Sequence, residues 1–128
     1  MPRRIIRDIF HFEGYRKSFR NAGRGILYLF FYHRNMRLIF IIGFITILIA
    51  LYVQLKGIEI VALGVTMTLV FMAEIFNTAV ELMMDAITEK YHAKIRLVKD
   101  IAASIVVISC LNALAVSYIL FGKKLGWY

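Results

Sequence analysis

Cysteine is nearly absent from this chain, and so are the motifs of common soluble enzymes. The one cysteine, Cys110, provides no disulfide framework and is expected to be a small packing residue inside an apolar run. The sequence has no G-x-x-x-x-G-K-[ST] phosphate loop, no H-E-x-x-H and no C-x-x-C, and Gly23-Arg24-Gly25 is too short for a dinucleotide fingerprint. The chemistry must therefore be sought elsewhere.

Charged side chains are missing from long parts of the sequence. Of its 128 residues 61% are hydrophobic, whereas a soluble domain is closer to about half apolar. Two runs of nearly 20 residues, 38–55 and 101–122, carry no charge, and the run 58–87 carries only acidic charges. Three spans cannot close a β-barrel, so we expect an all-α membrane protein. Within one domain of residues 1–128, the sequence predicts an N-terminal interfacial region at 1–32 and transmembrane helices at about 36–55, 58–87 and 98–122.

The N-terminal region has the pattern of an amphipathic surface helix. Over Pro2–Phe19, isoleucine and phenylalanine side chains share one helical face and arginines occupy much of the rest. Gly14, and then Gly23 and Gly25, are expected to interrupt this helix. No nucleic-acid recognition fold accompanies the basic residues, so anionic lipid headgroups are the expected partner. The first long apolar run begins too late for a signal peptide.

The net charge of +8 is unevenly distributed along the chain. Basic residues concentrate before the first span and in the connection Thr88–Lys99, whereas the turn Gln54–Glu59 has few. By the positive-inside rule, the N-terminus and the Thr88–Lys99 connection are expected to be cytoplasmic. Lys123 and Lys124 then face outward, against the rule.

Small residues recur along the third apolar run, at Ala102, Ser109, Ala113 and Ser117. Small side chains let membrane helices approach closely. Three helices enclose little interior, so a homo-oligomer is one interpretation of this stripe. Packing within a single protomer is the other.

Acidic and amide side chains interrupt the second span on one helical face. At 100° per residue, Glu81 and Asp85 lie about 20° on either side of Glu74, with Asn77 and Thr78 beside them. Carboxylates at membrane depth are expensive and usually functional. This acidic column predicts a cation, proton or phosphate site at a membrane boundary.

Two functions of different classes fit the acidic column. A proton or ion relay would need polar groups through the full depth of the bilayer, but Ile60–Ala73 offers only Thr66 and Thr68. Phosphoryl transfer needs carboxylates for a divalent metal, a lysine for phosphate and an acceptor for the hydroxyl proton. The residues that follow the column favour the second interpretation; they are Lys90, Tyr91, His92, Lys99 and Asp100.

These residues resemble a known family. The segments Lys17–Ile26, Ala73–Glu81 and Lys99–Ala103, with Asp85 and Tyr91-His92 at matching spacing, are similar to the prokaryotic diacylglycerol kinase and undecaprenol kinase family over nearly the whole chain. The resemblance implies a homotrimer of three-span subunits in the bacterial inner membrane. It also implies cytoplasmic active sites shared between subunits, which transfer the γ-phosphoryl of MgATP to the hydroxyl of a membrane lipid.

The resemblance also implies roles for individual residues. Glu74 matches the general base, Asn77 a residue that orients the site, and Glu81 a carboxylate that binds metal and meets the nucleotide phosphates. Asp85 would help with metal or nucleotide. The segments that match ATP contacts are Lys90, Tyr91, His92, Lys99 and Asp100. For each residue the alternative is a polar helix-end side chain that caps or pairs in place.

One position departs from the family pattern. The family has a second metal carboxylate in E-x-N before the first span, and this chain has His33-Arg34-Asn35 there. Imidazole suits zinc or transition ions better than magnesium. We therefore expect weaker magnesium binding, a different divalent metal or impaired catalysis. Alternatively, His33 faces lipid headgroups.

The lipid substrate is a finer question. Ala22–Ile26 and Asn77–Ala79 look more like the undecaprenol kinase branch than the diacylglycerol kinase branch. Undecaprenol is therefore the expected acceptor, with diacylglycerol as the alternative.

Overall fold

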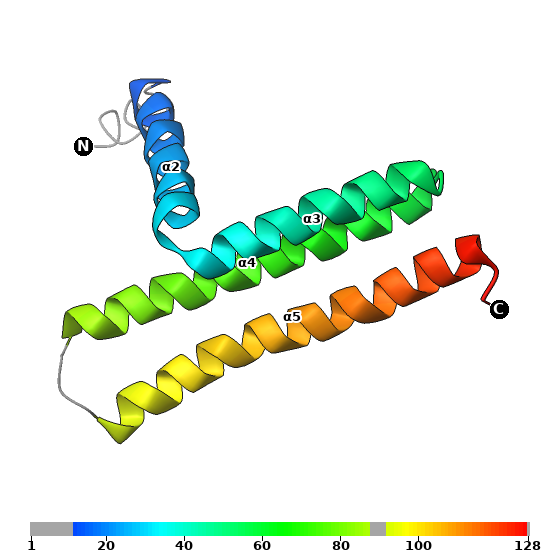
Figure 1. Ribbon diagram of the computed structural model, residues 1–128. Coiled ribbons are helices and arrows are strands. Elements are labelled where there is room, and N and C mark those ends of the chain that lie inside the picture. Colours follow the sequence, from blue (N-terminus) through cyan, green and yellow to red (C-terminus); the bar gives the residue numbers. More distant parts are fainter. Residues whose placement is uncertain (1–11, 88–91, 128) are drawn as a thin grey trace, which may run out of the picture. The chain divides into compact units, whose positions relative to one another are not determined.

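The computed structural model describes residues 12–87 and 92–127, and this part of the chain is entirely helical apart from short connections. The helices are α2 (Phe12–Tyr32), α3 (Arg34–Tyr52), α4 (Ile58–Ile87) and α5 (Ala93–Leu125) (Figure 1). By contacts the chain divides into two compact units, Met1–Arg34 and Asn35–Tyr128. The all-α prediction is confirmed.

Helix α2 continues through all three of its glycines. The predicted interruption at Gly14, Gly23 and Gly25 is therefore wrong. A helix-interior glycine costs only about 1 kcal/mol relative to alanine, and with no proline in α2 no backbone donor is lost. The Ser18 hydroxyl also donates to the Gly14 carbonyl oxygen at 3.0 Å. Residues 1–11 of the predicted surface helix lie outside the described residues.

Helices α3, α4 and α5 are each long and apolar enough to cross a membrane. With 30 residues in α4 and 33 in α5, these helices are about 45 and 50 Å long. A hydrocarbon core is about 30 Å thick, so their ends extend into the polar layers. Helix α5 accordingly begins five residues before its predicted span and ends three residues after it.

A tight turn joins α3 to α4. Gln54 adopts a left-handed conformation with φ of 57°. The Leu55 amide donates to the Ala50 carbonyl at 3.0 Å, and the Gln54 amide donates to the Leu51 carbonyl at 3.2 Å. These bonds are the Schellman pattern that ends a helix, and they end α3 three residues before the predicted limit of the first span. Leu55 then packs with Ala50 and Leu63 in a small buried cluster.

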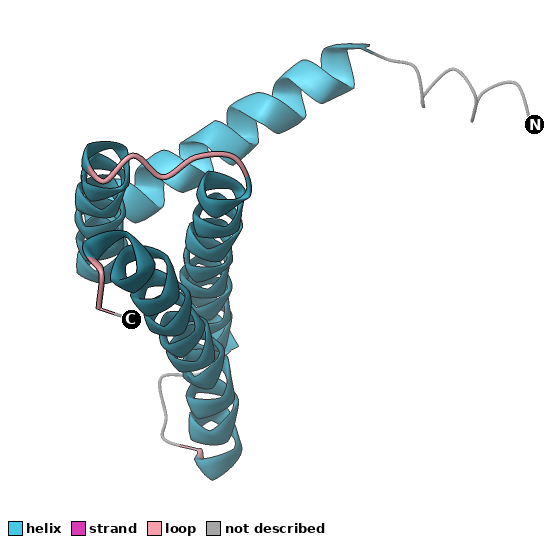
Figure 2. Cartoon of the chain, turned by 90° about the vertical axis from the view of Figure 1, so that its right-hand side faces the viewer, coloured by secondary structure: helices cyan, strands magenta, loops and turns pink. Residues whose placement is uncertain are grey.

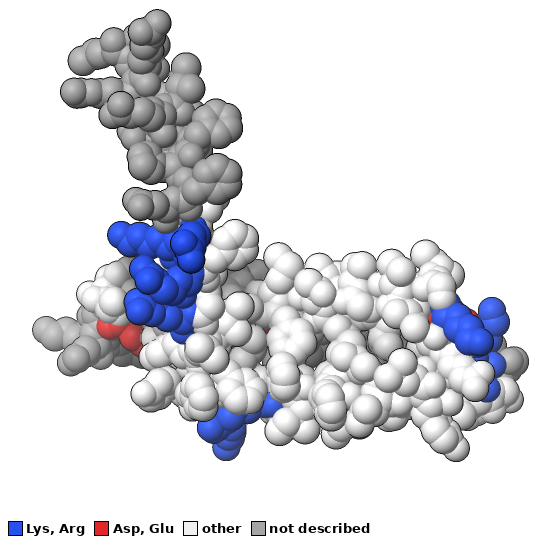
Figure 3. Space-filling model, turned by 90° about the horizontal axis from the view of Figure 1, so that it is seen from above, with Lys and Arg blue, Asp and Glu red and all other residues white. Residues whose placement is uncertain are grey.

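Helix α4 is the central element of the unit formed by α3, α4 and α5 (Figure 2). It packs along α5 and contacts α3 where Gly43 approaches Met67 and Phe71 closely. Few side chains are fully buried, and most large apolar ones are exposed. On the face drawn in Figure 3 the middle of the molecule carries no charge, as expected for a surface in contact with lipid or another subunit.

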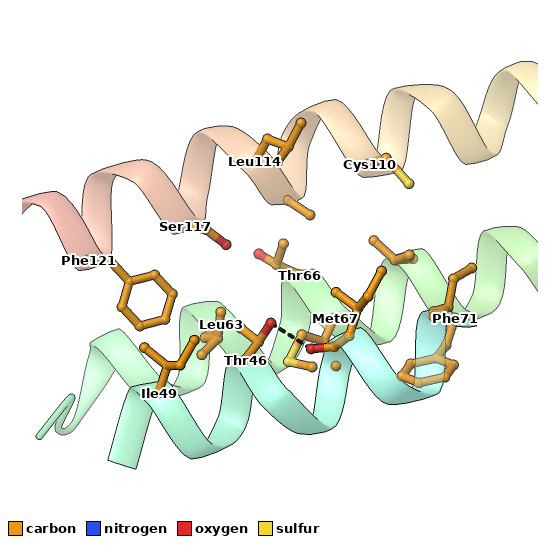
Figure 4. A pocket seen from close by; sticks show the side chains of 15 residues that line it. Thr46, Ile49, Leu63, Thr66, Met67, Phe71, Cys110, Leu114, Ser117 and Phe121 are labelled. Atoms are coloured by element: carbon orange, nitrogen blue, oxygen red, sulfur yellow. Dashed lines mark hydrogen bonds between the residues drawn. The ribbon is translucent and has the colours of Figure 1, made fainter. Parts of the chain in front are cut away.

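A cavity of about 430 Å³ lies between α3, α4 and α5 (Figure 4). Its walls are mostly apolar. The hydroxyls of Thr46 and Thr66 also line it, but each donates at 2.8 Å to a carbonyl of its own helix. Cys110 lies on the α5 side with Ala113 and Ser117, in agreement with a packing role for the lone cysteine.

The distribution of charge generates a prediction about topology. In a Cys110→Ser background, we expect Gln54→Cys to react with an impermeant maleimide in intact cells. Lys94→Cys should react only after the membrane is permeabilised, because its connection is expected to be cytoplasmic. Labelling of Lys94→Cys in intact cells would invert the predicted orientation.

Candidate active site at the end of α4

The acidic column of α4 changes from buried to exposed along the helix. Glu74, Asn77 and Thr78 are only 4%, 7% and 2% exposed, respectively. Glu81 is half-buried and Asp85 is exposed. At 1.5 Å per residue, about 16 Å of helix separates Glu74 from Asp85. The column therefore leads from the interior of the helical unit to an accessible surface.

Asn77 connects the buried and half-buried parts of the column. Its Nδ2 donates to Oε1 of Glu81 at 3.5 Å, which is the long limit for a hydrogen bond. Its Oδ1 is buried and has no hydrogen-bond partner within the described residues. Leaving a buried acceptor unsatisfied costs about 1–3 kcal/mol. An unsatisfied acceptor between two carboxylates is a feature of a site that is completed by a ligand.

The exposed end of the column meets α5. Lys99 Nζ forms a direct ion pair with Asp85 Oδ1 across the two helices. One turn away on α5, Arg96 Nε lies 3.9 Å from Asp100 Oδ2. Cationic and anionic groups from both helices therefore gather here, as a phosphate-binding surface requires.

The connection that precedes α5 is only partly described. His92 is extended, with φ of −132°, and is the residue at which α5 begins. Its carbonyl accepts a hydrogen bond from the Arg96 amide at 3.1 Å. Lys90 and Tyr91 lie outside the described residues, so their predicted ATP contacts stay predictions.

Sequence reasoning missed the pairing of Asp85 with Lys99 and treated the two as separate ligand contacts. A usable signal was present. Lys99 precedes Ala102 by three residues on α5, and Ala102, only 2% exposed, marks a buried face of that helix. Opposite charges near the adjoining ends of two consecutive antiparallel helices would have suggested the pair.

His33 belongs to the unit Met1–Arg34, whereas the acidic column belongs to the other unit. The His33 ring lies 5.8 Å from the Tyr28 ring in a tilted arrangement. Its amide donates to the Leu29 carbonyl at 3.0 Å. Its predicted place in a metal site stays a prediction.

The donor set suits a metal that arrives with its nucleotide. The described residues contain no group of three or more histidine, cysteine, aspartate and glutamate side chains that could hold an ion alone. Magnesium commonly takes one or two protein carboxylates and completes its shell with phosphate oxygens and water. Glu81 and the unsatisfied Asn77 oxygen fit this arrangement, and Asp85 lies one turn further along.

Three apolar helices with a buried carboxylate that leads to paired charges define an integral-membrane protein with a polar site near one membrane surface. Comparison with known proteins gives the family. The family described as prokaryotic diacylglycerol kinase matches residues 20–121, and the chain belongs to this family of lipid kinases.

Two curated relatives show the breadth of the family. The chain is 34% identical over 100 residues to a diacylglycerol kinase of Synechocystis sp. (strain ATCC 27184 / PCC 6803 / Kazusa), which covers 77% of this chain and 57% of that protein. It is 30% identical over 109 residues to the undecaprenol kinase of Bacillus subtilis (strain 168), which covers 85% and 89% of the two chains. The chain thus spans little more than half the length of the first relative.

The departure at His33 generates a prediction about metal affinity. We expect His33→Glu to lower the magnesium concentration for half-maximal activity by about fivefold, equivalent to about 1 kcal/mol of binding. The reason is that a carboxylate is a harder ligand than imidazole. Any advantage of zinc or manganese over magnesium should shrink as well.

Tyr32→Glu is the matched control, because it adds the same charge one residue away. Magnesium titrations of both variants and the native protein give the answer. If the His33→Glu and native curves superimpose, His33 has no part in holding the metal.

Proposed function

We propose that this protein transfers the γ-phosphoryl group of MgATP to the hydroxyl of a membrane lipid, at the cytoplasmic surface of the bacterial inner membrane. The observation that carries the proposal is the acidic column, with Glu74 buried among apolar residues and joined through Asn77 and Glu81 to the charged end of α4. Only a substrate with one lipidic and one ionic partner needs both ends of such a column. Family membership supports the same reaction.

Glu74 is the group that accepts the proton of the lipid hydroxyl in this proposal. A general base must lie within hydrogen-bond reach of the proton it takes. A hydroxyl that remains attached to a lipid can reach a carboxylate at membrane depth, whereas a water-soluble acceptor would have to leave water to do so. The burial of Glu74 therefore favours a lipid alcohol as the acceptor.

The apolar surroundings of Glu74 support a lipid acceptor too. The cavity between α3, α4 and α5 has Phe71 in its wall, one helical turn before Glu74. Its threonine hydroxyls are occupied by backbone carbonyls, so it offers an apolar chain no unsatisfied polar group. We propose that the hydrocarbon part of the substrate approaches Glu74 along this side.

Glu81 and Asn77 form the ionic part of the proposed site. Glu81 would bind magnesium together with the nucleotide phosphates, and Asn77 would orient the reacting groups through its unsatisfied oxygen. When bound, the metal neutralises charge on the phosphates. Lys99 supplies a positive charge to the phosphate oxygens, and His92 and Asp100 lie in the segments proposed to contact ATP.

The relay alternative finds less support. Above Glu74 the remaining polar side chains of α4 within the membrane are Thr66 and Thr68. Their hydroxyls donate to the Ala62 and Gly64 carbonyls at 2.8 and 2.9 Å, respectively. A chain of proton carriers would need donors and acceptors free to exchange. The column ends at Glu74, as an active site would.

We also propose that the protein works as a homotrimer with active sites shared between subunits. The many exposed apolar side chains on the three long helices leave room for subunit contacts within the membrane. Small residues on α5 allow such helices to approach closely. A shared site would also let the unit Met1–Arg34, with His33, contribute beside a neighbouring subunit.

For the acceptor lipid we propose undecaprenol, with diacylglycerol as the second candidate. The residues Ala22–Ile26 and Asn77–Ala79 favour the first. The greater identity to the Synechocystis diacylglycerol kinase favours the second, whereas the Bacillus undecaprenol kinase matches over nearly its whole length.

A phosphorylation assay tests the proposed function. Purified protein in mixed micelles should transfer labelled phosphate from ATP to undecaprenol, less to diacylglycerol, and none when lipid is left out. Transfer that does not depend on added lipid alcohol, or no transfer to either lipid, would contradict the proposal.

The column also predicts different effects for its two glutamates. Glu74→Gln should leave ATP binding intact but lower kcat by about 10²–10⁴-fold, since the variant lacks the proton acceptor. Glu81→Gln should instead raise the magnesium concentration needed for activity. Steady-state kinetics and nucleotide binding separate the two. Near-native turnover of Glu74→Gln would refute its role as the base.

A further inference from the structure

Asp85 occupies an unfavourable place for a carboxylate. It lies in the last turn of α4, two residues before the helix ends at Ile87. The carboxyl end of a helix carries partial negative charge, so an acidic side chain there is destabilised and a basic one would be favoured. That turn of α4 has no basic residue of its own. Asp85 therefore contributes little to α4 alone and must be explained by its partner.

That partner is Lys99, which reaches Asp85 from α5. The Lys99 side chain is 35% exposed and the Asp85 side chain 65% exposed. The lysine therefore lies mostly against the helices, with its ammonium at the surface. A lysine has four flexible side-chain bonds, and its position is set by what its ammonium contacts. Within the described residues, Asp85 is the group that gives Lys99 one position.

The other end of the same two helices has a pair of the same kind. Lys124 Nζ of α5 lies 3.3 Å from Glu59 Oε2 of α4 and donates to the Gln54 carbonyl at 3.4 Å. Glu59 also accepts a hydrogen bond from the Lys56 amide at 3.2 Å. This outer pair accounts for a lysine on the side of the membrane where the positive-inside rule expects few.

The spacing of the two pairs is matched. Along α4, 26 residues separate Glu59 from Asp85, and along α5, 25 residues separate Lys99 from Lys124. These separations correspond to about 39 and 38 Å of helix. The two pairs are therefore satisfied in one antiparallel register of α4 and α5. That register sets Lys99 beside the column.

We propose that Asp85 is a positioning residue, which holds the Lys99 ammonium beside Glu81 and Asn77 until nucleotide phosphates take it over. This assignment rests on the proposed kinase function and differs from the metal or nucleotide contact expected from the sequence. Asp85 acts through Lys99 and does not ligate the metal. Removing Asp85 therefore weakens MgATP binding only as far as it misplaces Lys99.

A double-mutant cycle tests the assignment. Asp85→Asn should raise KM for MgATP by about three- to tenfold, the range of a half-exposed charge contact, and change kcat by less than about twofold. Lys99→Met should raise KM further. In the Lys99→Met background, Asp85→Asn should add less than about twofold. Asp85→Glu should restore most of the loss.

Glu59→Gln is the matched control, because it breaks the same kind of pair between the same helices, far from the column. It should lower thermal stability about as much as Asp85→Asn and leave KM for MgATP unchanged. If Glu59→Gln raises KM equally, Asp85 acts by general stability and the proposal fails.

The magnesium dependence separates a positioning role from a ligand. We expect the magnesium concentration for half-maximal activity to be the same in Asp85→Asn and native protein. A shifted magnesium curve, or an Asp85→Asn effect that persists in full without Lys99, would assign Asp85 to the metal and overturn the proposal. If the native protein neither binds nor uses ATP, the proposed function itself fails.

Discussion

The constraint on which the rest of the structure depends is the burial of a carboxylate in an apolar helix. Glu74 is 4% exposed inside a helix whose neighbouring residues are nearly all apolar. Desolvating a carboxylate without compensation costs several kcal/mol. The Asn77 and Glu81 side chains continue the polar face toward water, so the helix must be long enough to carry it there. A 30-residue α4 follows from that requirement.

The second constraint is the alignment of α5 with α4. The residues proposed to meet ATP lie on both helices, so the site forms only if the two are held in one register. Ala73 and Ala102 are both almost fully buried and allow close packing. The ion pairs near the two ends then favour that register over one shifted by a turn. Apolar packing alone discriminates poorly between such shifts, because lipid-facing leucine and isoleucine side chains are alike at every turn.

Much of this arrangement could be predicted from the sequence. The uncharged runs fixed the class and the number of long helices, and the 100° periodicity put Glu74, Glu81 and Asp85 on one face. The unbroken path of α2 through Gly14, Gly23 and Gly25 could not be predicted, because a glycine penalty near 1 kcal/mol is easily outweighed by the rest of a helix. The left-handed turn at Gln54 and the Asp85–Lys99 pair also escaped, since both depend on how helices meet.

The most direct measurement is the location of the metal–nucleotide complex along α4. Nitroxide labels at Ala86→Cys and Val61→Cys, each in a Cys110→Ser background, mark the two ends of the helix, about 37 Å apart. With Mn²⁺ and a non-hydrolysable ATP analogue, the account predicts strong broadening of the Ala86→Cys spectrum and little change at Val61→Cys. Removal of the metal with EDTA should restore the first spectrum. Broadening only at Val61→Cys, or none at either label, would contradict a nucleotide site at the end of the acidic column.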